Sequence, residues 1–255
     1  MDAPVVLEAR GVTKRFGRVQ ALRGADFSVH QGEVVALVGD NGAGKSTLVK
    51  TLAGVHSPDA GEILFDGERV ELSSPVAARE LGIETVYQDL ALAPELDSTA
   101  NLFLGRETRR RGLLGRLGFM DQRRMAEQME ETCRSLGVNL QDRRVPVASL
   151  SGGQRQGVAV SRAVAWASKV VFMDEPTAAL GVVQTRKVLE LIGRVRDRGV
   201  AVVVISHSLP EVFEVADRIE VLRLGKRVAT FKTEDATIPD VVLAMTSGRV
   251  EEEDR

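Results

Sequence analysis

The sequence has a single cysteine and no long apolar run. Cys133 alone cannot form an internal disulfide framework or a cysteine-based zinc cluster, and it fits a reducing cytoplasm. The longest apolar runs, such as 34–38 and 201–205, are far shorter than the roughly 18 residues that a membrane-spanning helix requires. The first residues, MDAPVVLEARG, lack a basic region followed by an apolar stretch, so no signal peptide is predicted.

The sequence also has almost no net charge. Its 34 Lys and Arg residues balance 36 Asp and Glu residues, for a formal charge of −2. This balance supplies no general attraction to nucleic acid or anionic lipid, so any such contact must be local. With 44% hydrophobic and 27% charged residues, the 255 residues can form one large domain or a compact two-part domain. We expect a soluble intracellular protein that would serve a membrane only from outside the bilayer.

Short β-branched runs alternate with helical stretches along most of the chain. This alternation predicts an α/β domain that contains parallel strands. Three runs are too continuously apolar to face water and are predicted as central strands: 33–38, 170–173 and 200–205. Helices are predicted at 45–54, 153–167, 184–198 and 209–216. Shorter, more polar strands are predicted in the stretch up to residue 29 and at 63–65, 83–87, 219–222 and 227–231.

The segment from about residue 98 to residue 145 differs from this pattern and is predicted to be an inserted helical lobe. Helical spacing places four residues on one face: Met125, Met129, Cys133 and Leu136. A cofactor box is one interpretation of this stripe, but packing against neighbouring helices is favoured. The basic run at 106–111 (RETRRR) is interpreted as a solvated face, because no aromatic residues are interleaved with its arginines.

Residues 39–46, GDNGAGKS, match the phosphate-binding pattern G-x-x-x-x-G-K-[ST] between a predicted strand and a predicted helix. Glycines allow successive N–H groups to point at a polyphosphate, and the helix N-terminus adds partial positive charge. Lys45 would reach the β- and γ-phosphate oxygens, and the Ser46 hydroxyl would bind Mg²⁺. The alternative is a glycine-rich turn without a ligand. The candidate nucleotide-binding residues are Gly39, Asp40, Asn41, Gly42, Ala43, Gly44, Lys45, Ser46 and Thr47.

An apolar strand at 170–173 leads directly into two carboxylates, Asp174 and Glu175. Unpaired charge beside a core is costly unless cations or substrates meet it. Asp174, nearer the sheet, suits the Mg²⁺ shell, and Glu175 can polarise an attacking water. A helix cap or a salt bridge is the alternative explanation for this pair.

The most specific motif is LSGGQ at residues 150–154. Here the sequence resembles the ATP-binding cassette (ABC) ATPases, whose LSGGQ signature lies a helix's length before the Asp-Glu strand. The Ser-Gly-Gly stretch at a helix N-terminus would form a second anion cradle. The resemblance implies a head-to-tail homodimer in which one ATP contacts Lys45 of one subunit and the signature of the other. The signature residues implied to bind nucleotide are Ser151, Gly152, Gly153 and Gln154.

Other positions match the same family. Phe16 stands where the family has an aromatic residue that stacks on adenine, although a core phenylalanine is the alternative. Gln88 matches the glutamine that touches Mg²⁺ and links to the helical lobe. His207 matches the histidine that contacts the γ-phosphate, whereas His30 and His56 are interpreted as ordinary surface residues. The implied catalytic residues are thus Glu175, His207, Lys45 and Gln88, and the implied metal ligands are Ser46, Gln88 and Asp174.

One position departs from the family pattern. The family commonly has an aspartate where this chain has Gly181, which offers no carboxylate to the opposing site. The resemblance otherwise implies an α/β P-loop NTPase fold, an ABC-type nucleotide-binding domain with a mixed, largely parallel sheet core, an antiparallel β subdomain and an inserted α-helical lobe. Residues 1–250 would be one ABC ATPase domain, with its core in 1–90 and 150–250, its lobe at about 91–150, and an acidic tail at 251–255.

The stretches NLFLGRE (101–107) and PTAALG (176–181) look like those of bacterial ribose, xylose and fructose importers. This resemblance implies an ATP- and Mg²⁺-dependent ATPase at the cytoplasmic face of the cell membrane. Its implied partners are a second copy, integral-membrane permease subunits and, indirectly, a secreted sugar-binding protein, with no nucleic acid.

Three alternatives remain at this stage. One is an ABC ATPase for another transported substrate. Another is a non-transport ABC protein acting on DNA or translation. A DNA-acting relative would need a long coiled-coil insertion, and the segment of about 60 residues between Gln88 and Leu150 leaves no room for one. A P-loop kinase is the third, and it would have no use for LSGGQ.

Overall fold

The computed structural model describes residues 3–140, 142 and 144–248. They form two sheets, of strand order β2-β1-β4-β5 and β10-β9-β3-β8-β7-β6. Within the described part of the chain, no helix is both long and apolar enough to span a bilayer. The acidic tail that we expected at 251–255 lies outside the described residues.

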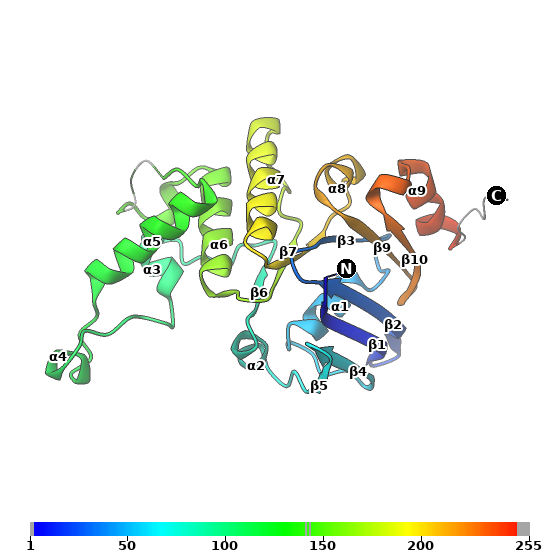
Figure 1. Ribbon diagram of the computed structural model, residues 1–255, viewed down its shortest axis with the longest axis horizontal. Helices are drawn as coiled ribbons and strands as arrows, with labels where there is room; N and C mark the ends of the chain where they lie inside the picture. The colour runs from blue at the N-terminus through cyan, green and yellow to red at the C-terminus, as the bar shows by residue number, and fades with distance from the viewer. Residues whose placement is uncertain (1–2, 141, 143, 249–255) are drawn as a thin grey trace.

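The six-stranded sheet forms the centre of the domain (Figure 1). Strands β3, β6, β7, β8 and β9 run parallel, and β10 pairs antiparallel with β9. Every residue of β3 and β8 is buried, which confirms the prediction that these continuously apolar runs are central strands. The strand bounds are β3 (Val34–Val38), β6 (Ile83–Val86), β7 (Val170–Asp174), β8 (Ala201–Ile205), β9 (Arg218–Arg223) and β10 (Lys226–Lys232).

The second sheet is antiparallel and covers one face of helix α1 (Lys45–Leu52). Helix α1 lies between the two sheets, because its Leu48 and Leu52 share one core with Phe27 of β2 and Val35 of β3. This packing fixes the N-terminus of α1 at the edge where β3 ends. The strands of this sheet are β1 (Val5–Phe16), β2 (Val19–His30), β4 (Ala60–Phe65) and β5 (Glu68–Val70).

Helices cover the other face of the central sheet (Figure 1). Their apolar sides share a core with alternate residues of β3, β7 and β8, such as Ala36, Met173 and Val204. These helices are α6 (Gly152–Trp166), α7 (Val182–Asp197), α8 (Leu209–Val215) and α9 (Ile238–Ser247). The first three match predicted helices, whereas the sequence analysis predicted neither α9 nor the short α2 (Pro75–Glu80).

The helical lobe lies at the left of Figure 1 and contains α3 (Ser98–Phe103), α4 (Leu113–Arg116) and α5 (Gln122–Leu136). The four residues of the predicted stripe on α5 are all buried. Three of them, Met125, Met129 and Cys133, share a small core with Leu102 and Phe103 of α3. The packing interpretation of the stripe is therefore confirmed.

The two histidines that we interpreted as ordinary surface residues are partly exposed, and each makes a defined contact. His30 is half-buried, and its Nδ1 lies 2.9 Å from Oε2 of Glu33. The His56 ring, also half-buried, packs edge-on against Phe16 with 5.1 Å between ring centroids. The His30 contact is local, because Glu33 lies three residues further along the chain, whereas the His56 contact joins residues far apart in the sequence.

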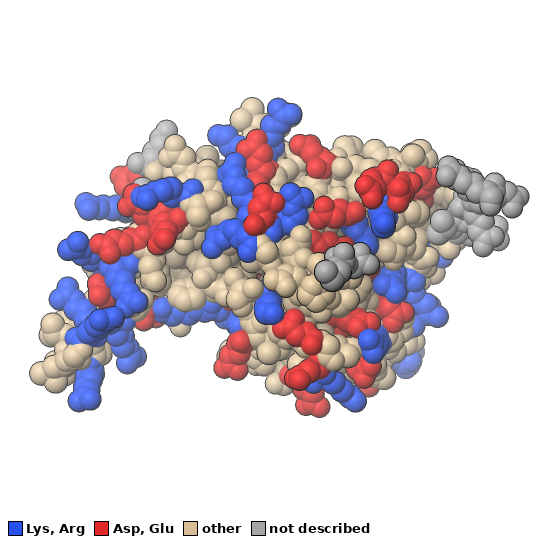
Figure 2. All heavy atoms as spheres, in the orientation of Figure 1, with Lys and Arg blue, Asp and Glu red and all other residues tan. Residues whose placement is uncertain are grey.

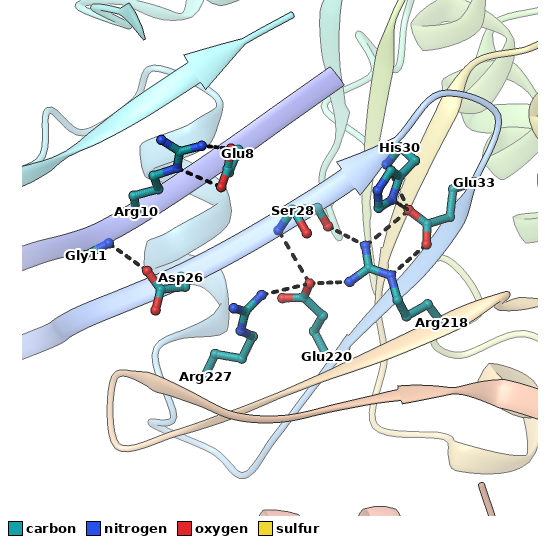
Figure 3. A network of polar contacts seen from close by, with 10 residues as sticks. All are labelled: Glu8, Arg10, Gly11, Asp26, Ser28, His30, Glu33, Arg218, Glu220 and Arg227. Carbon is teal, nitrogen blue, oxygen red and sulfur yellow. Dashed lines mark hydrogen bonds and ion pairs between the residues drawn. The ribbon is translucent and has the colours of Figure 1, made fainter. Parts of the chain in front are cut away.

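A network of charged groups ties the antiparallel sheet to the central sheet (Figure 3). Arg218 of β9 donates from Nε to Glu33 Oε1 at 2.7 Å, from Nη1 to Glu220 Oε1 at 2.5 Å, and from Nη2 to the Ser28 carbonyl at 2.7 Å. Arg227 of β10 reaches the same Glu220 oxygen at 3.4 Å. Burial raises the pKa of Glu220, and the two arginines only partly offset this effect. The network therefore contains two carboxylates whose pKa values are shifted in opposite directions, because that of Glu220 is raised and that of Glu33 is lowered.

We expect Glu33→Gln to flatten the acid dependence of stability. Burial alone would raise the pKa of Glu33, but hydrogen bonds from Arg218 and the His30 N–H hold it below its ordinary value of 4.5. Because the folded pKa lies below the unfolded one, Glu33 stabilises the fold above about pH 4.5 and loses this effect as pH falls through its folded pKa. Thermal unfolding between about pH 6 and pH 3 should show the wild type and the variant converging. The exposed Glu80→Gln variant serves as control, and parallel curves for Glu33→Gln and the wild type would contradict the prediction.

Candidate functional site

The loop at 39–44 leads from β3 into α1 and is held in a conformation that only glycine adopts easily. Gly39 and Gly44 have φ values of +150° and +106°. A Cβ at Gly39 would overlap the Leu222 carbonyl of β9, and one at Gly44 would lie 2.8 Å from the Ala21 carbonyl of β2. By contrast, a Cβ at Gly42 would meet nothing within 4 Å. The loop therefore packs closely on one side and is open on the other.

The open side of this loop presents hydrogen-bond donors. Within the described chain, Ala43 is the one residue of 40–44 whose N–H donates to a protein acceptor, the Asp40 carbonyl at 3.1 Å. The first N–H groups of α1 also have no intrahelical partner. Lys45 donates from Nζ to the carbonyls of Gly39 and Asp40, at 2.6 and 3.0 Å. Burial lowers the pKa of Lys45, and the nearby Glu175 partly offsets this effect. Such an array fits a polyanion.

A cavity of ≈ 410 Å³ lies over this loop, which is within the usual size range of small-molecule sites. Part of the lining comes from other elements and was not predicted from the sequence, namely Val19, Gln20, Ala21, Arg23 and Leu224. No local pattern marks these residues, because folding alone brings β2 and the β9–β10 turn to the loop. Phe16, at the end of β1, is 44% exposed and is not among the lining residues. Its ring contacts His56, and Lys14 Nζ lies 5.7 Å from the ring centroid.

The carboxylates and His207 meet at the ends of two neighbouring strands. Strands β7 and β8 run parallel with Asp174 beside Ile205, so the residues that follow them lie together. Glu175 Oε1 lies 2.8 Å from His207 Nδ1, a contact that the sequence analysis did not predict. The Glu175 side chain is 17% exposed and that of His207 is 78% exposed. This pair can hold a carboxylate in place while the other ring nitrogen of His207 remains open to solvent.

Glu175 also has an unusual backbone. Its φ of +48° lies in the left-handed region, which is uncommon for a residue with a side chain. Its N–H donates to the Ile205 carbonyl at 2.9 Å, which helps to hold this conformation. Strained backbone of this kind persists where the surrounding structure imposes it, and it occurs often at functional sites.

Asp174 lies in surroundings that disfavour its charged form. Burial raises its pKa, the adjacent Glu175 raises it further, and Lys50 and Lys45 offset this only in part. Within the part of the chain that the structure describes, no group of three or more His, Cys, Asp or Glu residues could hold a metal ion. A cation that binds here would need oxygen ligands from a bound anion as well, as Mg²⁺ has in phosphate sites.

Gln88 lies in an exposed turn that follows β6. Two residues of this turn, Leu90 and Ala91, have positive φ values of 60° and 44°. Arg162 of α6 donates to both of their carbonyls, at 2.9 and 2.6 Å. Arg162 was missed by the sequence analysis, and it joins the turn of Gln88 to the helix that begins with the signature.

We expect Arg162→Met to loosen the Gln88 turn. The substitution removes two charge-assisted hydrogen bonds from carbonyls in strained conformations, at a cost of about 1–3 kcal/mol in unfolding free energy. Hydrogen exchange of amides 88–92 should accelerate, while exchange in β3 stays slow. Arg186→Met, which removes an exposed arginine of α7, is the matched control. Unchanged exchange in the turn would show that Arg162 does not hold it.

The LSGGQ segment forms the N-terminus of α6. The Ser151 Oγ accepts from the Gln154 N–H at 3.3 Å, and the Gln154 Oε1 accepts from the Ser151 N–H at 3.0 Å. This capping box organises the first turn of the helix. Gly152 and Gly153 pack near Leu180 and Gln184, beside the start of α7. Gly181 is the N-cap of α7 and makes no side-chain capping bond, as expected without a carboxylate.

The two predicted cradles do not meet within one chain. Among the described residues, those lining the cavity over the 39–44 loop include none of residues 150–154. The structure thus brings Lys45, Asp174, Glu175 and the loop together, since Glu175 and Asp174 both act on the pKa of Lys45. It leaves the signature beside Leu180 and Gln184.

Comparison with known proteins places this geometry in a family. A family model described as ABC transporter matches residues 22–178. The chain is 51% identical to a fructose import ATP-binding protein of Rhizobium meliloti, over 96% of this chain and 95% of the relative. It is 47% identical to a xylose/arabinose import ATP-binding protein of Sulfolobus acidocaldarius, over 95% and 94%. A ribose import ATP-binding protein of Rubrobacter xylanophilus is 43% identical over 97% of this chain, which spans 48% of that relative.

Solved structures show the same fold. A nucleotide-free ATP-binding cassette from an ABC transporter superposes with a TM-score of 0.76 at 26% identity, over 89% of this chain and 91% of the other. The ADP conformation of another ATP-binding cassette superposes with a TM-score of 0.80 at 24% identity, over 96% of each chain. The predicted α/β P-loop fold with its mixed sheet is therefore confirmed. With the glycine loop, the Asp174–Glu175 pair and the LSGGQ helix all in place, the chain belongs to the ABC transporter family as one of its ATP-hydrolysing cassettes.

Proposed function

We propose that this cassette powers the uptake of a monosaccharide through a membrane permease. The observation that carries the proposal is the 51% identity to a fructose importer subunit over nearly the whole of both chains. Relatives named for xylose or arabinose and for ribose import support the broader class of monosaccharides rather than one sugar. We place the cassette at the cytoplasmic face of the membrane.

The geometry of the loop supports specific roles toward ATP. The free N–H groups of 40–44 and Lys45 would bind the β- and γ-phosphates, with Thr47 beside them at the start of α1. Phe16, at the end of the hairpin of β1 and β2, would contact the adenine. Ser46, Gln88 and Asp174 would hold Mg²⁺, which neutralises charge on the phosphates when bound.

We assign the attack on the γ-phosphate to a water oriented by Glu175. Its side chain is held by His207 at 2.8 Å, so the carboxylate keeps one orientation. The carboxylate can accept a proton from the water as the water oxygen bonds to the γ-phosphorus and the bond from that phosphorus to the β–γ bridging oxygen breaks, releasing ADP. His207 would act on the same phosphate through its exposed ring edge, and Lys45 would stabilise the charge that develops on the phosphate oxygens.

The separation of the two cradles supports a head-to-tail homodimer. In that dimer, Ser151 and the N–H groups of Gly152, Gly153 and the α6 terminus would complete the site over the partner's loop. The start of α7 beside the signature exposes two large apolar side chains, Val182 at 89% and Val183 at 65%. Burying such adjacent apolar groups favours association.

We propose that the permease contacts a groove between the sheet and the helical lobe. A cavity of ≈ 240 Å³ there is lined by Tyr87, next to Gln88, and by Leu104 and Arg106 beyond α3. Arg106 donates to Glu84 at 2.5 Å and lies 4.9 Å from the centroid of the Trp166 ring. This mixture of charged and aromatic groups is suited to a polar, reversible interface. The sugar would contact the permease and a secreted sugar-binding protein, not this chain.

Transport by the reconstituted complex tests the proposal. The cassette and its permease, in proteoliposomes with the binding protein, should accumulate labelled fructose, xylose or ribose only when Mg-ATP is on the cassette side. The same vesicles with Glu175→Gln should accumulate none. Uptake of none of these sugars by a complex whose ATPase is active would overturn the monosaccharide assignment.

A further inference from the structure

A small finger, residues 108–120, projects from the helical lobe around α4 (Figure 1). Its base is closed by the Arg109–Met120 bridge and by the Asp121 N–H, which donates to the Thr108 carbonyl at 2.7 Å. Gly115 is buried, and a Cβ added there would overlap the Arg110 carbonyl oxygen, so a larger residue would not fit. The finger is therefore an ordered element that holds its tip away from the lobe.

The tip of the finger is apolar and exposed. Large exposed apolar side chains are scattered singly elsewhere on most of the described surface, whereas the finger holds five within residues 113–120. At the tip the exposed fractions are 72% for Leu113, 45% for Leu114 and 66% for Leu117, and nearer the base they are 56% for Phe119 and 47% for Met120. Clustered exposed apolar side chains of this kind mark a site that contacts another protein or a membrane.

The same finger carries only positive charge. Residues 108–120 include four arginines and no acidic residue. All three of Arg110, Arg111 and Arg116 are exposed. Within the described residues, their guanidinium groups make no hydrogen bond and no ion pair with other protein groups. Figure 2 shows the result at its lower left, where an uncharged tip is bordered by arginines. These charges are free to meet an anionic partner.

We propose that the finger binds the anionic surface of a phospholipid membrane. The apolar tip would enter the boundary between headgroups and acyl chains, and the arginines behind it would contact lipid phosphates. A nucleic acid would pair with the arginines but would leave the aliphatic tip in water, and the finger has one aromatic residue for stacking. A convex apolar tip with a basic border fits a deformable anionic surface. The inference depends on the proposed transport function in one respect: that function decides which membrane the finger meets.

Vesicle binding by the full-length chain tests the inference. The protein should co-sediment with vesicles of phosphatidylcholine and phosphatidylglycerol, and weakly with pure phosphatidylcholine. Each arginine near an anionic surface contributes about a fivefold gain in binding, so Arg110→Gln with Arg111→Gln should weaken binding by about 25-fold. Arg123→Gln with Arg124→Gln is the matched control, because these arginines are exposed on α5 outside the finger. Equal binding of both double variants, or equal binding to both vesicle types, would overturn the proposal.

A label at the tip separates insertion from simple adsorption. A Leu117→Cys variant can be labelled there with an environment-sensitive fluorophore, because the native Cys133 is only 4% exposed. Its emission should shift to the blue on anionic vesicles, and no shift would overturn the insertion. If finger variants bind vesicles normally but lose permease-stimulated ATP hydrolysis, the partner is protein and the proposal fails. Vesicle binding without sugar uptake would count against the transport assignment alone.

Discussion

Replacing Glu175 with glutamine is expected to slow steady-state ATP hydrolysis by about 10²–10⁴-fold while leaving ATP binding intact. The two side chains have the same shape, so the contact with His207, which is 2.8 Å long in the wild type, can be kept by an amide oxygen. The amide cannot accept a proton from the attacking water. Phosphate release measures turnover, and calorimetry with Mg-ATP measures binding.

The same variant should accumulate an ATP-bound dimer, because hydrolysis would no longer open the two sites. Size exclusion with Mg-ATP reports this directly. Glu214→Gln, on the exposed side of α8, is the matched control and should hydrolyse ATP normally. Turnover near the wild-type rate would remove Glu175 from the reaction, and a purely monomeric ATP-bound variant would contradict the shared site.

Lys45→Ala should have an effect of similar size on the same reaction. Lys45 directly follows the 39–44 loop, and its Nζ donates to two carbonyls of that loop. Loss of a positioned donor to developing negative charge costs about 10²–10³-fold in turnover, and the weaker phosphate binding adds to this loss. Steady-state phosphate release and nucleotide affinity measure the two effects. Lys232→Ala, a distant exposed lysine, should change neither.

Mixing variants tests which subunit each cradle serves. A Lys45→Ala subunit and a Ser151→Ala subunit each lack one half of the proposed composite site. Their heterodimer should contain one site with both halves intact and should recover part of the hydrolysis. Ser151 also caps α6, so unfolding of the single variants must be measured alongside. Well-formed heterodimers without any recovered activity would contradict the partner-sharing geometry.

Short motifs predicted much of this site because contiguous residues build them. The glycine loop, the Asp174–Glu175 pair and the LSGGQ helix start each depend on a strand or helix end that the local pattern already marks. The central strands were predictable for the same reason, since residues buried on both faces leave a continuous apolar run. The short helices α2 and α4 were not predictable, because they are too short to show a periodic apolar face.

The family, the ATP-binding loop and the order of the chemical motifs could thus be derived from the amino-acid sequence alone. The folded chain was needed for the contact between Glu175 and His207, which are 32 residues apart, and for the contact of Arg162 with a turn 71 residues away. It was also needed to show that the arginines and leucines of 108–120 share one projecting surface. The physical reason is common to all three: strand order and packing bring distant residues together, and side-chain exposure depends on what those residues then cover.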